Sequence, residues 1–168
     1  EYNFQLLQLE PIINEVISMY KPKCQEKNIK IIFNKPANPI PLLSLDKEKI
    51  KIAIQNIIDN GIKYNVQNGE VRINIQKLTD KPYIQVDIED TGIGIPAKDL
   101  PNMFNKFFRS DNVIKQDTRG TGLGLHVTKN IIENHGGKIW IESIEKRGTT
   151  IHFVLPTDPA LIPPQYQK

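Results

Sequence analysis

The sequence has little cysteine, little excess charge and no long apolar run. Its single cysteine, Cys24, excludes an internal disulfide and any metal site built from several cysteines, and it fits a reducing compartment. The net charge of +3 is small and the basic residues are dispersed, so we expect no nucleic-acid binding. No apolar run approaches the roughly 20 residues that cross a bilayer, so we expect no direct membrane contact.

The chain has 168 residues, of which 39% are apolar and 24% charged. These values are typical of one folded domain with a hydrophobic core. No internal repeat and no signal peptide are visible. Because the chain begins at Glu1 without Met, we expect it to be a piece of a longer protein.

Hydrophobic periodicity predicts the helices and strands. Strands are expected over residues 4–9, 29–34, 71–76, 83–89, 138–143 and 149–155. Helices are expected over residues 11–28, over 47–64, over a short segment near 100–104, and after Gly124. Pro22 should bend or interrupt the first of these helices, and Asp46 should be the N-cap of the second. Residues 110–118 form a polar segment without periodicity, which predicts a mobile loop.

This order of elements predicts an α+β fold, a two-layer sandwich of one mixed sheet with helices on one face. A doubly wound parallel sheet is disfavoured, because neighbouring strands lack crossover helices. We expect the domain to span residues 1–156 and residues 157–168 to form an unstructured tail.

The segment Gly120-Thr121-Gly122-Leu123-Gly124-Leu125 leads directly into a helical pattern. Glycines let the backbone approach a ligand closely, and a helix start offers free N–H groups and the positive end of the helix dipole. The segment therefore fits a phosphate cradle. A flexible turn before a helix is the alternative, because short glycine motifs are common.

Three other segments carry polar or aromatic residues that could bind a ligand. Asn56, Asn60, Lys63 and Tyr64 share one side of the second long helix, where amide oxygens suit Mg²⁺ and Lys63 suits phosphate; an ordinary solvated face is the alternative. Asp90 follows a strand and precedes Gly92 and Gly94. Its carboxylate could accept a hydrogen bond from the adenine amine, or it could form an ordinary Asx turn.

The third of these segments is residues 104–109, where phenylalanines precede the polar loop and Lys106 and Arg109 could reach phosphate. Core aromatics that close a short helix are the alternative. Each signal is weak by itself, whereas their occurrence in this order is specific.

Together the four segments resemble the catalytic and ATP-binding domain of sensor histidine kinases, within the superfamily that also holds gyrase, Hsp90 and MutL. Residues 56–64, 90–94, 104–109 and 120–125 are similar to its N, G1, F and G2 boxes, and the match runs from about Phe4 to Pro156. The resemblance implies the Bergerat-type ATP-binding fold, with a lid between the last two boxes. It also implies the cofactors ATP and Mg²⁺.

The resemblance implies a role for each matching residue. Asp90 reads the adenine amine, Asn60 binds Mg²⁺, and Lys63 and Arg109 contact phosphates. The implied catalytic residues are Asn56, Lys63 and Arg109. The implied ATP-binding residues are Asn56, Asn60, Lys63, Tyr64, Asp90, Gly92, Gly94, Ile95, Phe107, Arg109, Gly120, Thr121, Gly122, Leu123, Gly124 and Leu125.

Three positions depart from the family pattern. Gly61 stands where the family usually has Ala, Phe108 replaces a common Tyr, and Arg119 precedes the glycines where the family is more often uncharged. Arg119 could add a phosphate contact or only face solvent. At Asn56 the ATPase branches carry a Glu that activates water, and because Asn cannot take a proton, the sequence favours phosphoryl transfer over hydrolysis.

The expected function is therefore that of a protein-histidine kinase domain. The chain's own His126, His135 and His152 lack the residues that mark a phosphoacceptor, so we interpret them as structural or surface residues. The resemblance implies two partners, a phosphoacceptor helical dimerisation domain of the same parent protein and a response regulator. We expect a cytoplasmic domain, whose parent protein could carry a membrane anchor. The alternatives are a nucleotide-binding regulatory module without transfer activity and an ATPase of the same superfamily.

Overall fold

A computed structural model describes residues 1–117 and 119–167 of the chain. Its main sheet has five strands in the order β2-β4-β5-β7-β6. The strands are β2 (Lys30–Asn34), β4 (Glu70–Lys77), β5 (Tyr83–Asp90), β6 (Lys138–Ile144) and β7 (Gly148–Pro156). Strands β2 and β4 pair in parallel and all other neighbours are antiparallel, so the sheet is mixed, as predicted.

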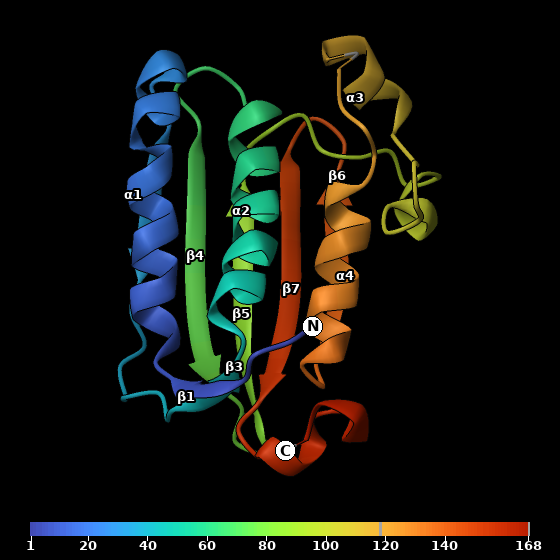
Figure 1. The fold of residues 1–168 in the computed structure, drawn as a ribbon. Helices are drawn as coiled ribbons and strands as arrows, with labels where there is room; N and C mark the ends of the chain where they lie inside the picture. Colours follow the sequence, from blue (N-terminus) through green and yellow to red (C-terminus); the bar gives the residue numbers. More distant parts are fainter. Residues whose placement is uncertain (118, 168) are drawn as a thin grey trace.

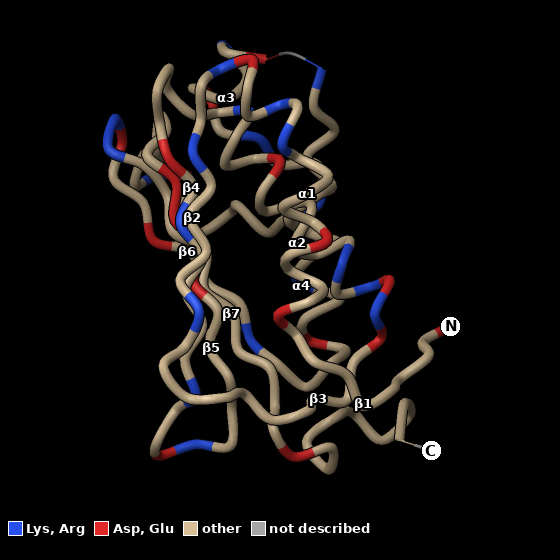
Figure 2. Tube along the Cα trace, turned by 90° about the vertical axis from the view of Figure 1, so that its left-hand side faces the viewer, with Lys and Arg blue, Asp and Glu red and all other residues tan. Residues whose placement is uncertain are grey.

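Three long helices cover one face of this sheet (Figure 1). They are α1 (Leu9–Lys27), α2 (Lys47–Lys63) and α4 (Gly124–Asn134). Figure 2 shows the two layers edge on, with charges of both signs along the outer sides of the sheet and helices. The predicted two-layer α+β sandwich is therefore confirmed. No helix within the described ranges has the length and apolarity needed to cross a membrane.

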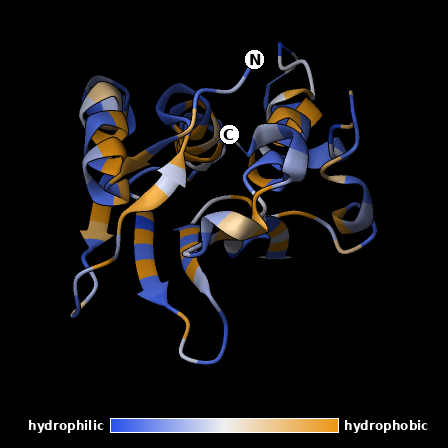
Figure 3. Cartoon of the chain, turned by 60° about the horizontal axis from the view of Figure 1, so that its bottom comes forward, coloured by the Kyte–Doolittle hydropathy of each residue, from blue (hydrophilic) through white to orange (hydrophobic). Residues whose placement is uncertain are grey.

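The core lies between the two layers because both elements place their apolar residues there. Ile84, Val86 and Ile88 alternate along β5 and are buried, while Ile54 and Ile58 lie one turn apart on α2 and are buried against the sheet. Figure 3 shows this as alternating hydrophilic and hydrophobic bands along the strands.

Helix α2 begins at the predicted cap. Asp46 Oδ1 accepts a hydrogen bond from the Lys49 N–H at 3.0 Å, which satisfies a free donor of the first turn. The Asp46 N–H donates to His135 Nε2 at 3.0 Å, and His135 Nδ1 donates to the Ile131 carbonyl oxygen at 2.7 Å. His135 is fully buried, and burial lowers its pKa, so it acts as a neutral link between α2 and α4.

The N-terminal region departs from the predicted elements. The first strand is shorter than expected, β1 (Gln5–Leu7), and it pairs antiparallel with β3 (Leu43–Leu45), which was not predicted. Pro22 does not interrupt the first helix, because α1 continues through it. The proline is exposed, so water can satisfy the carbonyl group that loses its helical donor.

The expected polar loop contains a helix, α3 (Asp111–Gln116), whose Val113 is buried. A short helical pattern was missed there because only one of its six residues is buried. Thr118, the last residue of the expected loop, lies outside the described residues.

The segment after β7 is also ordered where an unstructured tail was expected. It forms two short 3-10 helices, η2 (Pro159–Leu161) and η3 (Pro164–Tyr166), and buries Ile162. The Tyr166 ring packs against Tyr2, with 4.8 Å between ring centroids. The two ends of the described chain therefore lie together, at the end of the molecule away from α3 (Figure 1). Lys168 lies outside the described residues.

Candidate functional site

A cavity of about 250 Å³ opens between the end of α2, the start of α4 and the segment that joins β5 to α4. Its lining includes most of the residues singled out in the sequence, namely Asn56, Asn60, Lys63, Tyr64, Asp90, Gly94, Ile95, Arg109, Gly120, Thr121, Gly122, Gly124 and Leu125. These residues come from separate stretches of sequence. Their convergence on one cavity identifies the candidate site.

Three of the implied ATP-binding residues do not line the cavity, and neither do Lys106 and Arg119. Gly92 supports it from behind, because its N–H donates to Asp90 Oδ1 at 2.8 Å. Leu123 is the N-cap residue of α4. Phe107 is 66% exposed with a positive φ of 65°, and it is the next residue, Phe108, that lines the cavity.

Asp90 is the last residue of β5 and places a carboxylate at one end of the cavity. Burial raises its pKa to about 7, although hydrogen bonds from the backbone of Gly92 and Thr149 oppose the rise. The carboxylate is thus held in a fixed direction with part of its accepting capacity free for a ligand.

The apolar walls of the cavity were not predicted from the sequence. They are formed by Ile57, Ile88, Ile93, Met103, Val113, Ile141 and Ile151. On the sequence these residues look like ordinary core positions, because strand and helix periodicity cannot distinguish a side chain that faces the core from one that faces a cavity. The walls make the Asp90 end suitable for a flat, largely apolar ring.

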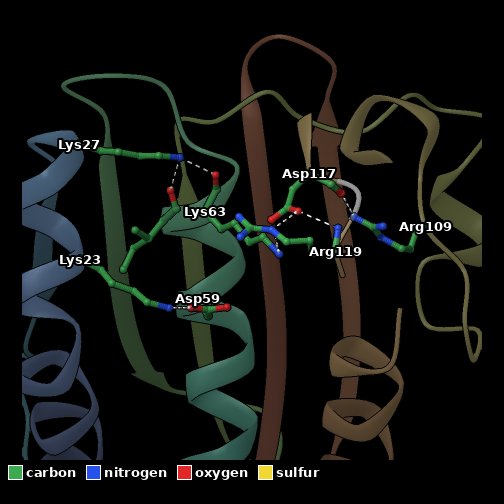
Figure 4. A network of polar contacts seen from close by, with 8 residues as sticks. Lys23, Lys27, Asp59, Lys63, Arg109, Asp117 and Arg119 are labelled. Atoms are coloured by element: carbon green, nitrogen blue, oxygen red, sulfur yellow. Dashed lines mark hydrogen bonds and ion pairs between the residues drawn. The ribbon is translucent and has the colours of Figure 1, made fainter. Parts of the chain in front are cut away.

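The end of α2 carries the polar residues of the site. Lys63 Nζ lies 5.2 Å from the centre of the Tyr64 ring. From α1, the Lys27 ammonium donates to the carbonyl oxygens of Lys63 at 2.6 Å and Ile62 at 3.5 Å (Figure 4). Nearby, Lys23 forms an ion pair of 2.7 Å with Asp59. The last turn of α2 is therefore fastened to α1.

Asn56 connects α2 to α4. Its side-chain amide donates to the Gly124 carbonyl oxygen at 3.1 Å and to Thr128 Oγ1 at 3.2 Å. The amide group therefore fixes the start of α4 beside α2. This leaves the Asn56 carbonyl oxygen as the polar atom that it can offer to the cavity.

Asp117 lies just after α3 and contacts the basic residues Lys63, Arg109 and Arg119 (Figure 4). Asp117 Oδ2 lies 3.0 Å from Lys63 Nζ, and Oδ1 accepts from the Arg119 N–H at 2.8 Å. The Arg109 guanidinium donates to the Asp117 carbonyl oxygen. The Arg119 N–H, and next the Lys63 ammonium, hold the pKa of Asp117 well below its usual range. Burial alone would lower the pKa of Lys63, but hydrogen bonds to Asp117 and Tyr64 raise it.

No group of three or more His, Cys, Asp or Glu residues within residues 1–117 and 119–167 could hold a metal ion. Asn60 lines the cavity one helical turn before Lys63 and Tyr64. Its amide carbonyl is an oxygen ligand of the kind that Mg²⁺ accepts together with phosphate oxygens and water. The donor set therefore fits a magnesium ion that is brought in with a phosphate ligand.

The three histidines have structural surroundings. His135 is the buried link described above, and His126 Nδ1 contacts the Phe104 carbonyl oxygen at 3.2 Å. His152 lies on the sheet face away from the helices, where its Nδ1 is 2.6 Å from Asp87 Oδ1 and its ring stacks on Trp140. None of the three lines the cavity.

Comparison with known proteins gives one family and many relatives. Residues 45–159 match the family described as histidine kinase-, DNA gyrase B-, and HSP90-like ATPase. Sensor histidine kinase WalK of Bacillus subtilis (strain 168) is 34% identical over 156 residues, which cover 93% of this chain and 25% of WalK. The chain thus spans about a quarter of the length of this relative.

Solved structures give the same result. The catalytic domain of histidine kinase ThkA superposes with a TM-score of 0.80 at 30% identity, covering 95% of this chain and 99% of that domain. ThkA in complex with the response regulator protein TrrA matches with a TM-score of 0.75 at 27% identity, covering 94% of this chain and 42% of that chain.

Proposed function

The chain belongs to the family of histidine kinase-, DNA gyrase B-, and HSP90-like ATPases, and we propose that it binds ATP with Mg²⁺ and transfers the γ-phosphoryl group to a histidine on a separate helical domain. Its fold is that of a histidine kinase catalytic domain, which confirms the resemblance indicated by the four motifs. The proposal rests on one observation, that Asp90, Lys63 and the three glycines Gly120, Gly122 and Gly124 line the same cavity.

The adenine ring fits the Asp90 end of the cavity. Its exocyclic amine is a donor, and the Asp90 carboxylate is an acceptor that Gly92 and Thr149 hold in place. The isoleucines of β5, β6 and β7 offer apolar contact to the faces of the ring. Gly94 also lines the cavity, and its positive φ of 66° suits glycine.

The phosphates fit the opposite end, between α2 and α4. Lys63 contributes a charge there and Arg109 a planar guanidinium. The segment Gly120–Gly124 leads into the first turn of α4, whose free N–H groups and dipole favour an anion. A triphosphate lying along this segment would reach all three features.

Asn60 would hold magnesium through its amide carbonyl oxygen, and the ion would neutralise part of the phosphate charge. Asn60 supplies a single neutral oxygen, so most of the ligands come from the nucleotide and water. Lys63 lies on the same turn of α2, and its ammonium group would orient the phosphates.

In the transfer, the bond from the γ-phosphorus to the β–γ bridging oxygen breaks, a bond to an imidazole nitrogen of the acceptor forms, and ADP leaves. The protein positions the phosphates and balances their charge, which is most of what such a reaction requires. Asn56 cannot accept a proton, and its amide is engaged by Gly124 and Thr128. This supports transfer to a histidine over hydrolysis by activated water.

The acceptor histidine belongs to a phosphoacceptor helical dimerisation domain of the same parent protein, and a response regulator receives the phosphoryl group next. The similarity to ThkA, whose structure includes a response regulator, supports this assignment. The domain works on the cytoplasmic side, where ATP is available.

The test is incubation of the purified chain with Mg-ATP labelled at the γ-phosphate, with and without the helical domain of its own parent protein. Label on a histidine of that domain, with little free phosphate from this chain alone, is the expected result. Free phosphate without the helical domain would establish an ATPase instead. Binding of ATP with neither product would leave a nucleotide-binding regulatory module.

A further inference from the structure

A carboxylate of the chain itself lies in the region where the proposed phosphates bind. Asp117 Oδ2 is 3.0 Å from Lys63 Nζ, and the Asp117 side chain is only 14% exposed although it follows the exposed helix α3. Figure 4 shows this side chain directed toward Lys63 of α2. Lys63 is therefore already paired with an anion of the chain itself.

The same residue also engages the second cation assigned to the phosphates. The Arg109 guanidinium donates to the Asp117 carbonyl oxygen. A third basic residue, Arg119, holds Asp117 Oδ1 through its backbone N–H at 2.8 Å and lies 3.4 Å away through Nε. Asp117 thus lies among three basic residues that border the glycine segment.

We propose that Asp117 is a specificity-determining residue, which occupies the phosphate subsite of the free domain and must leave Lys63 before a nucleotide phosphate can bind there. This inference rests on the proposed function and deepens it at the same subsite. Two anions cannot share one ammonium without mutual repulsion. The affinity for ATP should therefore be weaker than that of a subsite without this carboxylate.

Because a phosphate has to displace Asp117 from Lys63, ligands with and without phosphates should differ in how they bind. A nucleoside such as adenosine fills only the Asp90 end and leaves the Asp117–Lys63 pair intact. ATP has to replace the carboxylate, and its several negative charges interact with Lys63 more strongly than one carboxylate does. The subsite therefore selects polyphosphates over weaker anions.

The variant Asp117→Asn tests this proposal because it removes only the charge. An asparagine keeps an oxygen for the Arg119 N–H and leaves the backbone carbonyl oxygen for Arg109. Asp111→Asn is the matched control, since it removes the same charge from α3 at a side chain that is 69% exposed and pairs with Lys98. Urea unfolding of each variant checks that the fold is kept.

Titration calorimetry with ATP and with adenosine gives the readout. Asp117→Asn should tighten ATP binding by roughly two- to fivefold, the usual range for a partly exposed ion pair, and leave adenosine binding unchanged. Asp111→Asn should change neither. In a Lys63→Met background, Asp117→Asn should no longer tighten ATP binding, because the pair is already absent.

A measurement on the unmodified chain gives a second test of the displacement of Asp117. The carboxyl carbon NMR signal of Asp117 should shift on saturation with ATP and stay in place with adenosine. Unchanged ATP affinity in Asp117→Asn, equal tightening of adenosine, or a gain that persists in the Lys63→Met background would each overturn the proposal. If the unmodified chain binds neither ligand, the proposed function fails as well. If the unmodified chain binds both ligands and one of these contrary results is found, only the role of Asp117 is refuted.

Discussion

The side-chain ammonium of Lys27 donates a hydrogen bond to the backbone carbonyl oxygen of Lys63 at 2.6 Å, so helix α1 caps the end of α2 that carries the candidate site. A positive charge there also opposes the negative end of the helix dipole. Because Lys63 and Asn60 lie on this last turn, we expect the contact to hold both side chains in position.

Lys27→Met should therefore reduce the free energy of unfolding by roughly 1 kcal/mol and weaken ATP binding several-fold. Lys23→Met is the matched control, since it removes the same charge one turn earlier on α1 from an ion pair whose lysine is 59% exposed. Such pairs contribute little, so this variant should lose less than about 0.5 kcal/mol and keep its ATP affinity. Equal losses of stability and ATP affinity in both variants would show that the removed positive charge matters and the Lys27 contact with Lys63 does not.

The raised pKa of Asp90 predicts a pH dependence of stability. Burial raises this pKa to about 7 in the folded chain, from 3.8 in an unperturbed aspartate. Between these pH values the folded state holds a proton that the unfolded chain has released, so the free energy of unfolding falls as pH rises from about 4 to about 7. Below and above this window the group contributes no slope.

Urea denaturation of the unmodified chain and of Asp90→Asn, at pH 5 and at pH 8, measures the effect. Asparagine does not titrate, so the difference between the two proteins should change by on the order of 2 kcal/mol in favour of the variant at the higher pH. A constant difference would mean that Asp90 titrates normally.

Asn60 is proposed to bind Mg²⁺. The variant Asn60→Ala should therefore lose the Mg²⁺ dependence of ATP affinity, measured by calorimetry in magnesium and in EDTA. Gln55→Ala, on the same helix but outside the cavity lining, should retain the dependence. If the dependence survives in Asn60→Ala, the metal ligand lies elsewhere.

The two adjacent phenylalanines should differ in function. Phe108 lines the cavity, whereas Phe107 is 66% exposed. Phe108→Ala should weaken adenosine binding by roughly fivefold, because about 1 kcal/mol of apolar contact is lost. Phe107→Ala should leave adenosine binding unchanged, and the reverse pattern would restore the role that the sequence resemblance implied for Phe107.

Gly61 gives a prediction on stability alone. A Cβ atom added there would lie 3.4 Å from Asp90 Cβ and 3.4 Å from Val71 Cγ2, which is ordinary contact. Gly61→Ala should therefore raise the free energy of unfolding by roughly 0.5–1 kcal/mol, because alanine favours the helix. Gly122→Ala should do the opposite, since φ there is +70° and the added atom would lie 2.7 Å from the Phe107 carbonyl carbon. Thermal unfolding of both variants decides.

The main elements could be predicted because their signals are local. Asp46 caps a helix whose isoleucines repeat every three or four residues, and Ile84, Val86 and Ile88 alternate along a strand. The short strand β3 could not be predicted, because its three residues depend on pairing with β1 rather than on their own pattern. The ordered C-terminal segment likewise depends on partners distant in sequence, such as Tyr2.

In the candidate site, too, local patterns could be predicted and contacts between distant residues could not. The glycines, Asp90 and the polar face of α2 could be singled out from the sequence because each has a distinctive local pattern. The pairing of Asp117 with Lys63 could not, since 54 positions separate the two residues and nothing local to either indicates the other. The apolar walls were missed for the reason that cavity and core positions share one periodicity.

The contact between Tyr2 and Tyr166 has a consequence for how the chain can be connected. Since these residues lie side by side, a linker of a few residues could join the two ends of the described chain without strain. New ends opened between Ala37 and Asn38, in the exposed connection between β2 and β3, would interrupt no helix or strand. Such a circular permutant should fold and keep the cavity unchanged, because α2, α4 and the segment that joins β5 to α4 retain their connections.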